Sequence, residues 1–240
     1  MTRMDMMTAS CAVGLIAMAG AALFAYRWAP RAGHIFARRA HSRAIGEEMR
    51  ISVSSQGKAI GRRAALFAII LVAVGFVRGG IVVGLMCVPW SFVAASLYAA
   101  DVGYGYLPHE LNALLLLAGV AVQGVLDTHA LLFGCFAGSA FALASSSLRL
   151  LGRCTGRDLI GGGDVKAIVG ISVGSGFGCI AGSLACCVAV LVVEGTRSVI
   201  LKVRSAHTQD SARCCIGTEK RTFPLAPYLM VWLLVGFALG

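Results

Sequence analysis

Long runs of hydrophobic residues alternate with short polar stretches along most of this chain. Several of the runs approach the ~20 residues with which a helix crosses a bilayer. The pattern predicts eight membrane helices, at residues 8–26, 64–77, 81–100, 111–125, 129–150, 165–173, 178–193 and 223–239. The predicted fold class is therefore all-α, a polytopic membrane helix bundle of about eight transmembrane helices.

Three short stretches are predicted to turn the chain between successive helices, at residues 78–80, 126–128 and 174–176. The run at 64–77 is short for a hydrocarbon core ~30 Å thick at a rise of ~1.5 Å per residue. We therefore expect Arg63 and Arg78, which flank this run, to extend their side chains to the two membrane interfaces.

Composition supports the membrane class. Hydrophobic residues make up 58% of the chain and charged residues 13%, whereas about a quarter of an ordinary soluble domain is charged. The formal charge of +10 is concentrated in two polar segments, residues 27–63 and 196–221. Short basic loops are retained in the cytoplasm, so this charge predicts topology, and no nucleic-acid partner is expected.

The charge distribution also predicts the organisation of the chain. The first seven residues carry no net positive charge, whereas the segment after the first run is strongly basic. This bias favours an uncleaved helix with its amino terminus outside. We expect a transmembrane helix within residues 1–26, a basic cytoplasmic linker at 27–63 and a membrane domain at 64–240, with both termini outside.

Metal and cofactor chemistry has little support in the sequence. No pair among the nine cysteines has the CxxC spacing of a zinc site. The sequence contains no other cluster of metal ligands, so neither a metal nor a cofactor is predicted.

Two aspartates are predicted to lie at the same membrane face. Asp101 directly follows the third run and Asp164 directly precedes the sixth. Two crossings separate them, and an even number of crossings returns the chain to the face from which it started. Two carboxylates in a partly dry site share a proton, because the pKa of one of them rises, and the ionised member can activate water. Aspartic proteases work in this way.

A purely structural interpretation fits the topology as well. An acid at the amino terminus of a helix is favourable by ~0.3–1 kcal/mol, which would explain Asp164. Asp101 follows the carboxyl end of a helix, where the helix dipole disfavours a negative charge, so this interpretation does not explain it.

Three sequence strings together resemble the type IV prepilin peptidases, which are bacterial GxGD membrane aspartyl proteases. The strings are DVGYGYLPHELN at 101–112, GGGDVKAIVG at 161–170 and FPLAPYL at 223–229. They resemble, in order, an aspartate with a proline seven residues later, the Gly-x-Gly-Asp-x-Lys motif and the start of the last helix of that family. The matching residues are Asp101, Pro108, Gly161, Gly163, Asp164 and Lys166.

The resemblance, which covers about residues 64–240, implies a specific activity. Such enzymes cleave the basic leader from prepilin and pseudopilin precursors at the cytoplasmic face of the inner membrane, in pilus assembly and protein secretion. It implies that Asp101 and Asp164 are the catalytic pair. Gly161, Gly163, Lys166 and Pro108 would support the active-site loop, with Lys166 in a structural role and Pro108 shaping a helix start.

The chain departs from the family pattern at two places. His109 stands where the family usually has aspartate. Many members carry two CxxC pairs in the first cytoplasmic loop and also methylate the new amino terminus, but residues 27–63 contain no cysteine. The chain therefore resembles short forms without the zinc-bound subdomain, so the resemblance implies cleavage and does not extend to N-methylation.

Two alternatives remain open. The presenilin and signal-peptide-peptidase type of GxGD protease uses a Tyr-Asp pair, but here two alanines separate Tyr98 from Asp101. A non-catalytic transporter or assembly subunit is the rival from another class. A transporter places ionisable groups near the bilayer midplane, whereas the predicted spans contain no internal aspartate or glutamate.

Overall fold

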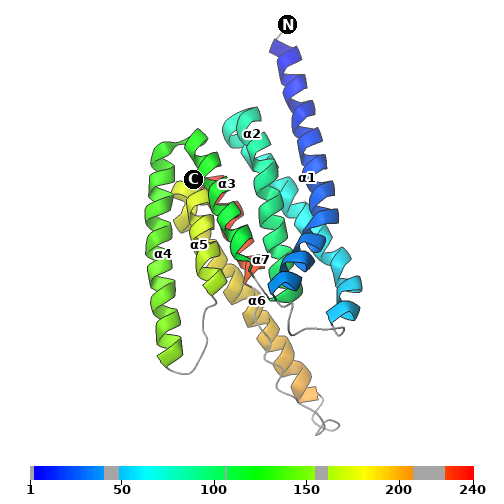
Figure 1. Ribbon diagram of the computed structural model, residues 1–240, viewed down its shortest axis with the longest axis vertical. Coiled ribbons are helices and arrows are strands. Elements are labelled where there is room, and N and C mark those ends of the chain that lie inside the picture. The colour runs from blue at the N-terminus through cyan, green and yellow to red at the C-terminus, as the bar shows by residue number, and fades with distance from the viewer. Residues whose placement is uncertain (1–2, 41–48, 106, 155–161, 208–224) are drawn as a thin grey trace.

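The computed structural model describes residues 3–40, 49–105, 107–154, 162–207 and 225–240. These residues are almost entirely helical, and no strand occurs among them. The expected all-α class is confirmed. Figure 1 shows helices running up and down side by side, several of them joined by short turns at the upper end.

Seven α-helices and one short 3-10 helix make up the described chain. They are α1 (Arg3–Ala40), α2 (Met49–Tyr104), α3 (His109–Leu126), α4 (Thr128–Cys154), α5 (Gly162–Ser175), η1 (Gly176–Gly178), α6 (Cys179–His207) and α7 (Ala226–Leu239).

Helix α2 is a hairpin of two arms, because the backbone leaves the helical conformation at Gly79 and Gly80. Gly80 has a φ of 66°, a region that L side chains rarely adopt, so glycine is required to reverse the chain here. The other two predicted turns are also present. Asp127, in extended conformation, separates α3 from α4, and η1 separates α5 from α6.

Several helices are suited to a membrane by length and composition. Among the described residues, five stretches are long and apolar enough to cross one, and α7 is a shorter apolar helix. Two of the five contain a reversal, at the α2 hairpin and at η1. The membrane character is confirmed at this level, and eight crossings stay a prediction.

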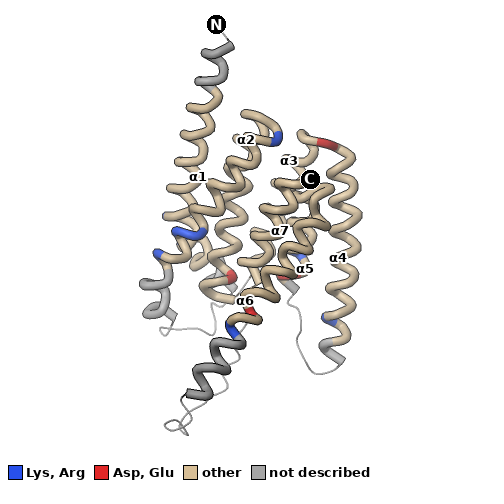
Figure 2. Tube along the Cα trace, turned by 180° about the vertical axis from the view of Figure 1, so that it is seen from behind, with Lys and Arg blue, Asp and Glu red and all other residues tan. Residues whose placement is uncertain are grey.

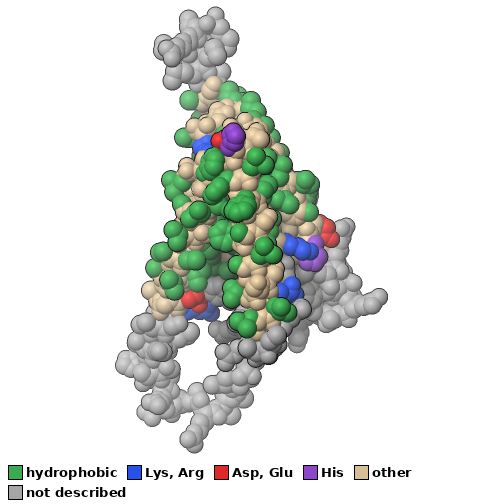
Figure 3. Space-filling model, turned by 90° about the vertical axis from the view of Figure 1, so that its left-hand side faces the viewer, with side chains coloured by type: hydrophobic (Ala, Val, Ile, Leu, Met, Phe, Trp, Pro, Cys, Tyr) green, Lys and Arg blue, Asp and Glu red, His purple; other side chains and the backbone are tan. Residues whose placement is uncertain are grey.

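The outer surface of the bundle is apolar. Large hydrophobic side chains such as Ile16, Val77 and Phe136 are strongly exposed. Figure 3 shows hydrophobic side chains covering the middle of one face, with charged and histidine side chains toward its upper and lower parts. Figure 2 shows charged positions at the upper turns and others in the lower half of the bundle, with a basic stretch about halfway down beside α1. An exposed apolar band between two polar zones is suited to contact with lipid.

Several helix ends differ from the sequence expectation. α1 continues beyond residue 26 to Ala40, and α2 already begins at Met49, so much of the expected linker at 27–63 is helical. Hydropathy marks where a helix leaves an apolar environment, and polar residues with good helix propensity continue the helix beyond that point. Residues 41–48 of the linker lie outside the described residues.

Helix α5 packs closely between α3 and α4. A Cβ added to Gly119 of α3 would lie 3.1 Å from the backbone of Gly174 in α5. On the other side, a Cβ at Gly134 of α4 would lie 2.9 Å from the carbonyl oxygen of Ser172. Small residues at these positions let the helix backbones approach, as in other membrane bundles.

Arg78, at the turn of the α2 hairpin, contacts the carboxyl end of α7. Its Nη1 donates a hydrogen bond of 2.6 Å to the carbonyl oxygen of Phe237, and its guanidinium lies 5.1 Å from the centre of the Phe237 ring. The last carbonyls of a helix have no partner inside the helix, and a cation there is favourable. Arg78 therefore joins the α2 turn to the carboxyl end of α7.

We expect the substitution Gly119→Ala to lower the melting temperature of the purified protein in detergent. The added Cβ would press on the Gly174 backbone at 3.1 Å, and over-packing of a close contact costs about 1–3 kcal/mol. Gly124→Ala in the same helix is the matched control, because its Cβ would meet only the end of the Leu131 side chain at 3.9 Å. Equal melting temperatures for the two variants would contradict the close α3–α5 contact.

Candidate functional site

The topology brings the two predicted acids to the same end of the bundle. The second arm of α2 descends toward the lower end in Figure 1, and α5 starts from that end. Asp101 does not lie just past its helix, as the sequence suggested, but in the last turn of α2, which continues to Tyr104. The second arm of α2 ends at Gly105, which has a φ of 61° and whose N–H donates to the Asp101 carbonyl.

The carboxylate of Asp101 is bound to the amino terminus of α7. Asp101 is only 7% exposed. Its Oδ2 accepts a hydrogen bond of 2.7 Å from the backbone N–H of Ala226, and the backbone N–H of Leu225 also donates to it. The first N–H groups of a helix have no partner inside the helix, and the dipole favours an anion there. The dipole of α2, which carries Asp101, disfavours a negative charge at this position. The dipole of α7, a helix distant in sequence, favours it.

Asp164 lies in the first turn of α5, which begins at Gly162, and its side chain is partly buried. It is near enough to Asp101 for the two carboxyl groups to repel each other electrostatically. The structure thus brings the two acids together at one site.

The GxGD segment contacts the segment that follows Asp101. A Cβ added to Gly163 would lie 2.8 Å from the Cβ of Leu107 and 3.1 Å from the Leu107 carbonyl oxygen. No side chain fits at Gly163 without moving this backbone, so glycine is required by the close approach. Gly161, the other glycine of the motif, lies outside the described residues.

Pro108 is buried and is the N-cap residue of α3, as its predicted role in shaping a helix start requires. One turn further along α3, the side-chain amide of Asn112 donates a hydrogen bond of 3.3 Å to the carbonyl oxygen of Gly163. Asn112 is the last residue of the string at 101–112, for which the sequence predicted no particular role. The signal that could have found it is a polar amide in an otherwise apolar helix, which is costly to bury unless it is paired.

Lys166 lies at the exposed edge of this site. Its Nζ is 3.4 Å from Nδ1 of His109, and both side chains are exposed. The pair connects the first turn of α5 to the first turn of α3. This is consistent with the expected structural role of Lys166.

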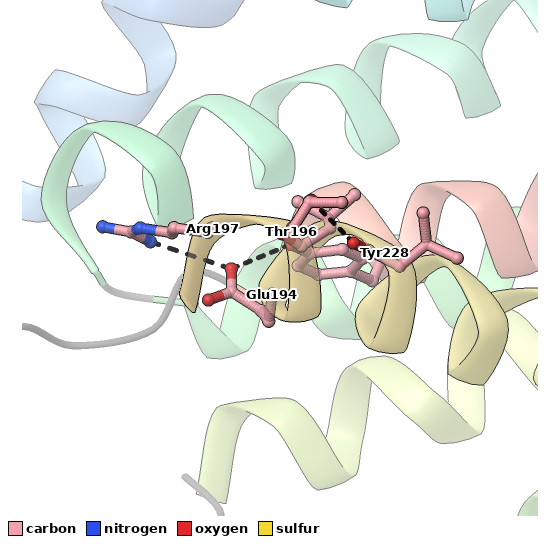
Figure 4. Close-up of polar contacts among 6 residues, drawn as sticks. Glu194, Thr196, Arg197 and Tyr228 are labelled. Atoms are coloured by element: carbon pink, nitrogen blue, oxygen red, sulfur yellow. Dashed lines mark hydrogen bonds and ion pairs between the residues drawn. The ribbon is translucent and has the colours of Figure 1, made fainter. Parts of the chain in front are cut away.

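The third motif reaches the site through α7. Residues 223 and 224 of the motif lie outside the described residues, and Pro227 lies in the first turn of α7. The hydroxyl of Tyr228 donates to Oε1 of Glu194 on α6 at 3.2 Å, and Arg197 lies 3.7 Å from the same oxygen. Figure 4 shows the Glu194 carboxylate between these two partners. This contact, which the sequence did not indicate, connects the start of α7 to α6.

The described residues contain no group of three or more His, Cys, Asp or Glu side chains that could hold a metal ion. The polar groups that do converge are the two carboxyls, the Asn112 amide and the backbone N–H groups at the start of α7.

No family model, curated protein or solved structure matches the chain.

We expect Asp101→Ala to lower the melting temperature in detergent more than Asp101→Asn. Alanine leaves the buried N–H of Ala226 without its acceptor, and an unpaired buried donor costs about 1–3 kcal/mol. Asparagine keeps an acceptor oxygen in the same place. Equal melting temperatures for the two variants would mean that the contact between Asp101 and α7 does not contribute measurably to stability.

Proposed function

We propose that the protein is a membrane aspartyl endopeptidase that cleaves the basic leader from prepilin-like or pseudopilin precursors. The observation that carries the proposal is the convergence of three sequence strings that lie far apart along the chain. Asp101 and Leu107 from the first, Gly163 and Asp164 from the second and Ala226 from the third meet at one end of the bundle.

The two carboxyl groups supply the chemistry of the proposed reaction. The burial of Asp101, together with the repulsion between the two carboxyl groups, favours a state in which the pair holds one proton. The ionised carboxyl removes a proton from a water molecule, and the resulting hydroxyl attacks the scissile carbonyl carbon. The protonated carboxyl donates a hydrogen bond to the carbonyl oxygen and then supplies the proton with which the amine leaves. No cofactor takes part.

The depth of the site supports cleavage at a membrane surface. Tyr26 and Trp28 are exposed on α1 beside basic residues, a pattern typical of the membrane–water interface. Gly33 of the same helix packs against Ala99 and Ala100. Five residues of helix separate Trp28 from Gly33, or ~7.5 Å. The position of Asp101 beyond these aromatic residues supports a site near the membrane surface, within reach of water.

The proposal includes the orientation in the cell. The described parts of the two basic segments, residues 27–40, 49–63 and 196–207, lie toward the end of the bundle that carries the acids, and short basic loops are retained in the cytoplasm. This supports a multi-pass protein of the inner membrane with eight crossings, both termini outside and the active site facing the cytoplasm. Its partners are precursor proteins and membrane lipid.

One observation favours a second candidate function. The Asp101 carboxylate is occupied by the amino terminus of α7, and a helix cap by itself explains a buried acid. In that case the protein would be a non-catalytic membrane subunit of a pilus or secretion assembly. Conservative substitution of the acids separates the two candidates, because asparagine keeps the hydrogen-bond acceptor and cannot serve as a base.

We expect Asp101→Asn and Asp164→Asn each to reduce cleavage of a membrane-embedded prepilin at least ~100-fold, since general acid–base catalysis contributes about 10²–10⁴-fold. Purified protein in lipid would be incubated with the precursor, and the product identified by its mass. S-adenosylmethionine would be supplied as well, and we expect no added methyl group.

The control variant is Asp127→Asn, at the turn between α3 and α4, which should cleave at the wild-type rate because it lies at the opposite end of the bundle. Cleavage by wild type and by both active-site variants alike would disprove the aspartyl mechanism. Failure of folded wild-type protein on a panel of different leaders would favour the non-catalytic subunit.

A further inference from the structure

Helices α3 and α5 run parallel and are joined by two equivalent hydrogen bonds. The amide of Asn112 donates to the carbonyl of Gly163 at 3.3 Å, and the amide of Gln123 donates to the carbonyl of Gly174 at 2.6 Å. Both donors lie 51 residues before their acceptors. The two bonds therefore hold the same register between the helices.

The positions of the two donors follow from helix geometry. Asn112 and Gln123 are eleven residues apart on α3, which is close to three turns and places them on one face, ~16 Å apart along the axis. Both side chains are buried, Asn112 at 3% exposure and Gln123 at 0%. In an apolar environment an amide without a partner is costly, so each bond favours this register over its alternatives.

Backbone contacts between the two bonds leave little freedom to slide. Gly119 lies against Gly174, and Gly170 lies against Leu115, where an added Cβ would approach to 3.3 Å. The interface is thus closely packed over most of its length. At the lower end of this interface, α5 begins with two glycines, Gly162 and Gly163.

The bond from Asn112 to Gly163 lies next to the two acids, whereas the bond from Gln123 to Gly174 does not. Gly163 directly precedes Asp164, and two consecutive glycines give this backbone more conformational freedom than any other pair of residues would. Asn112 belongs to the same short segment as Asp101, since only eleven residues separate them. A bond from Asn112 to Gly163 therefore joins the backbone of one acid to the segment that carries the other.

We propose that Asn112 is a positioning residue for the catalytic pair, an inference that rests on the proposed peptidase function. Its side-chain amide fixes Gly163 and thereby sets Asp164 at its working separation from Asp101. Gln123 is its structural counterpart at the far end of the same helix pair, where it holds the register without contact with the acids.

The experiment compares Asn112→Leu with Gln123→Leu. Each variant removes one amide donor and leaves a glycine carbonyl without it. We expect Asn112→Leu to lower kcat at least ~10-fold with KM within about twofold of wild type, because a misplacement of ~1 Å costs up to ~100-fold in rate. Gln123→Leu should lower the melting temperature and keep kcat within about twofold.

Amide hydrogen exchange gives a readout that does not depend on activity. In Asn112→Leu we expect faster exchange in the peptide at residues 163–167, with exchange in α4 unchanged. If the wild type cleaves no precursor, the peptidase proposal fails, and the exchange experiment still decides whether Asn112 holds this turn. Wild-type kcat together with wild-type exchange in Asn112→Leu would overturn the positioning role.

Asn112→Asp provides a chemical test of the same bond. An ionised carboxylate cannot donate to the Gly163 carbonyl, whereas a protonated one can. The ratio of the variant's kcat to the wild-type kcat should therefore rise as the pH falls, and the corresponding ratio for Asn112→Leu should stay flat. Both variants keep the same neighbouring titratable groups, which are Asp101, Asp164, His109 and Lys166. Parallel pH profiles for the two variants would contradict donation from position 112.

Discussion

The hydrogen bond from the Ala226 N–H to the Asp101 carboxylate is the contact on which the arrangement of this end of the bundle depends. Asp101 is buried, and buried backbone groups and charges must find partners within the protein, because leaving water without a partner is costly. The start of α7 has unpaired N–H groups and Asp101 has a charge, so each satisfies the other. This pairing places the last described helix beside the hairpin of α2.

Three other polar contacts of the bundle follow the same constraint. Arg78 binds the carboxyl end of α7, and the amides of Asn112 and Gln123 bind glycine carbonyls of α5. Each of these polar side chains is directed at a backbone group of another helix. The interface between α3 and α5 is therefore held by close backbone packing along its length and by one amide at either end. A rigid pair of this kind suits a site whose two acids come from different helices.

Much of the architecture could be predicted from the order of apolar and polar residues. The helical class, the reversals at Gly79–Gly80, Asp127 and Gly176, and the placement of both acids at one end all follow from that order. The ends of α1 and α2 did not, because hydropathy reports the environment of a residue and not whether the helix continues. The catalytic interpretation of Asp101 and Asp164 began as a resemblance and stays a proposal.

By itself, then, the sequence determined which segments are helices, where they reverse and which residues share an end of the bundle. Only the tertiary structure decided that Asp101 caps α7, that Asn112 holds Gly163 and that Glu194 binds Tyr228. The physical reason lies in the uniform hydrophobicity of the helices. In a membrane, apolar side chains face both the lipid and the protein interior, so the pattern does not encode the rotation or register of one helix against another. Those are set by the contacts themselves.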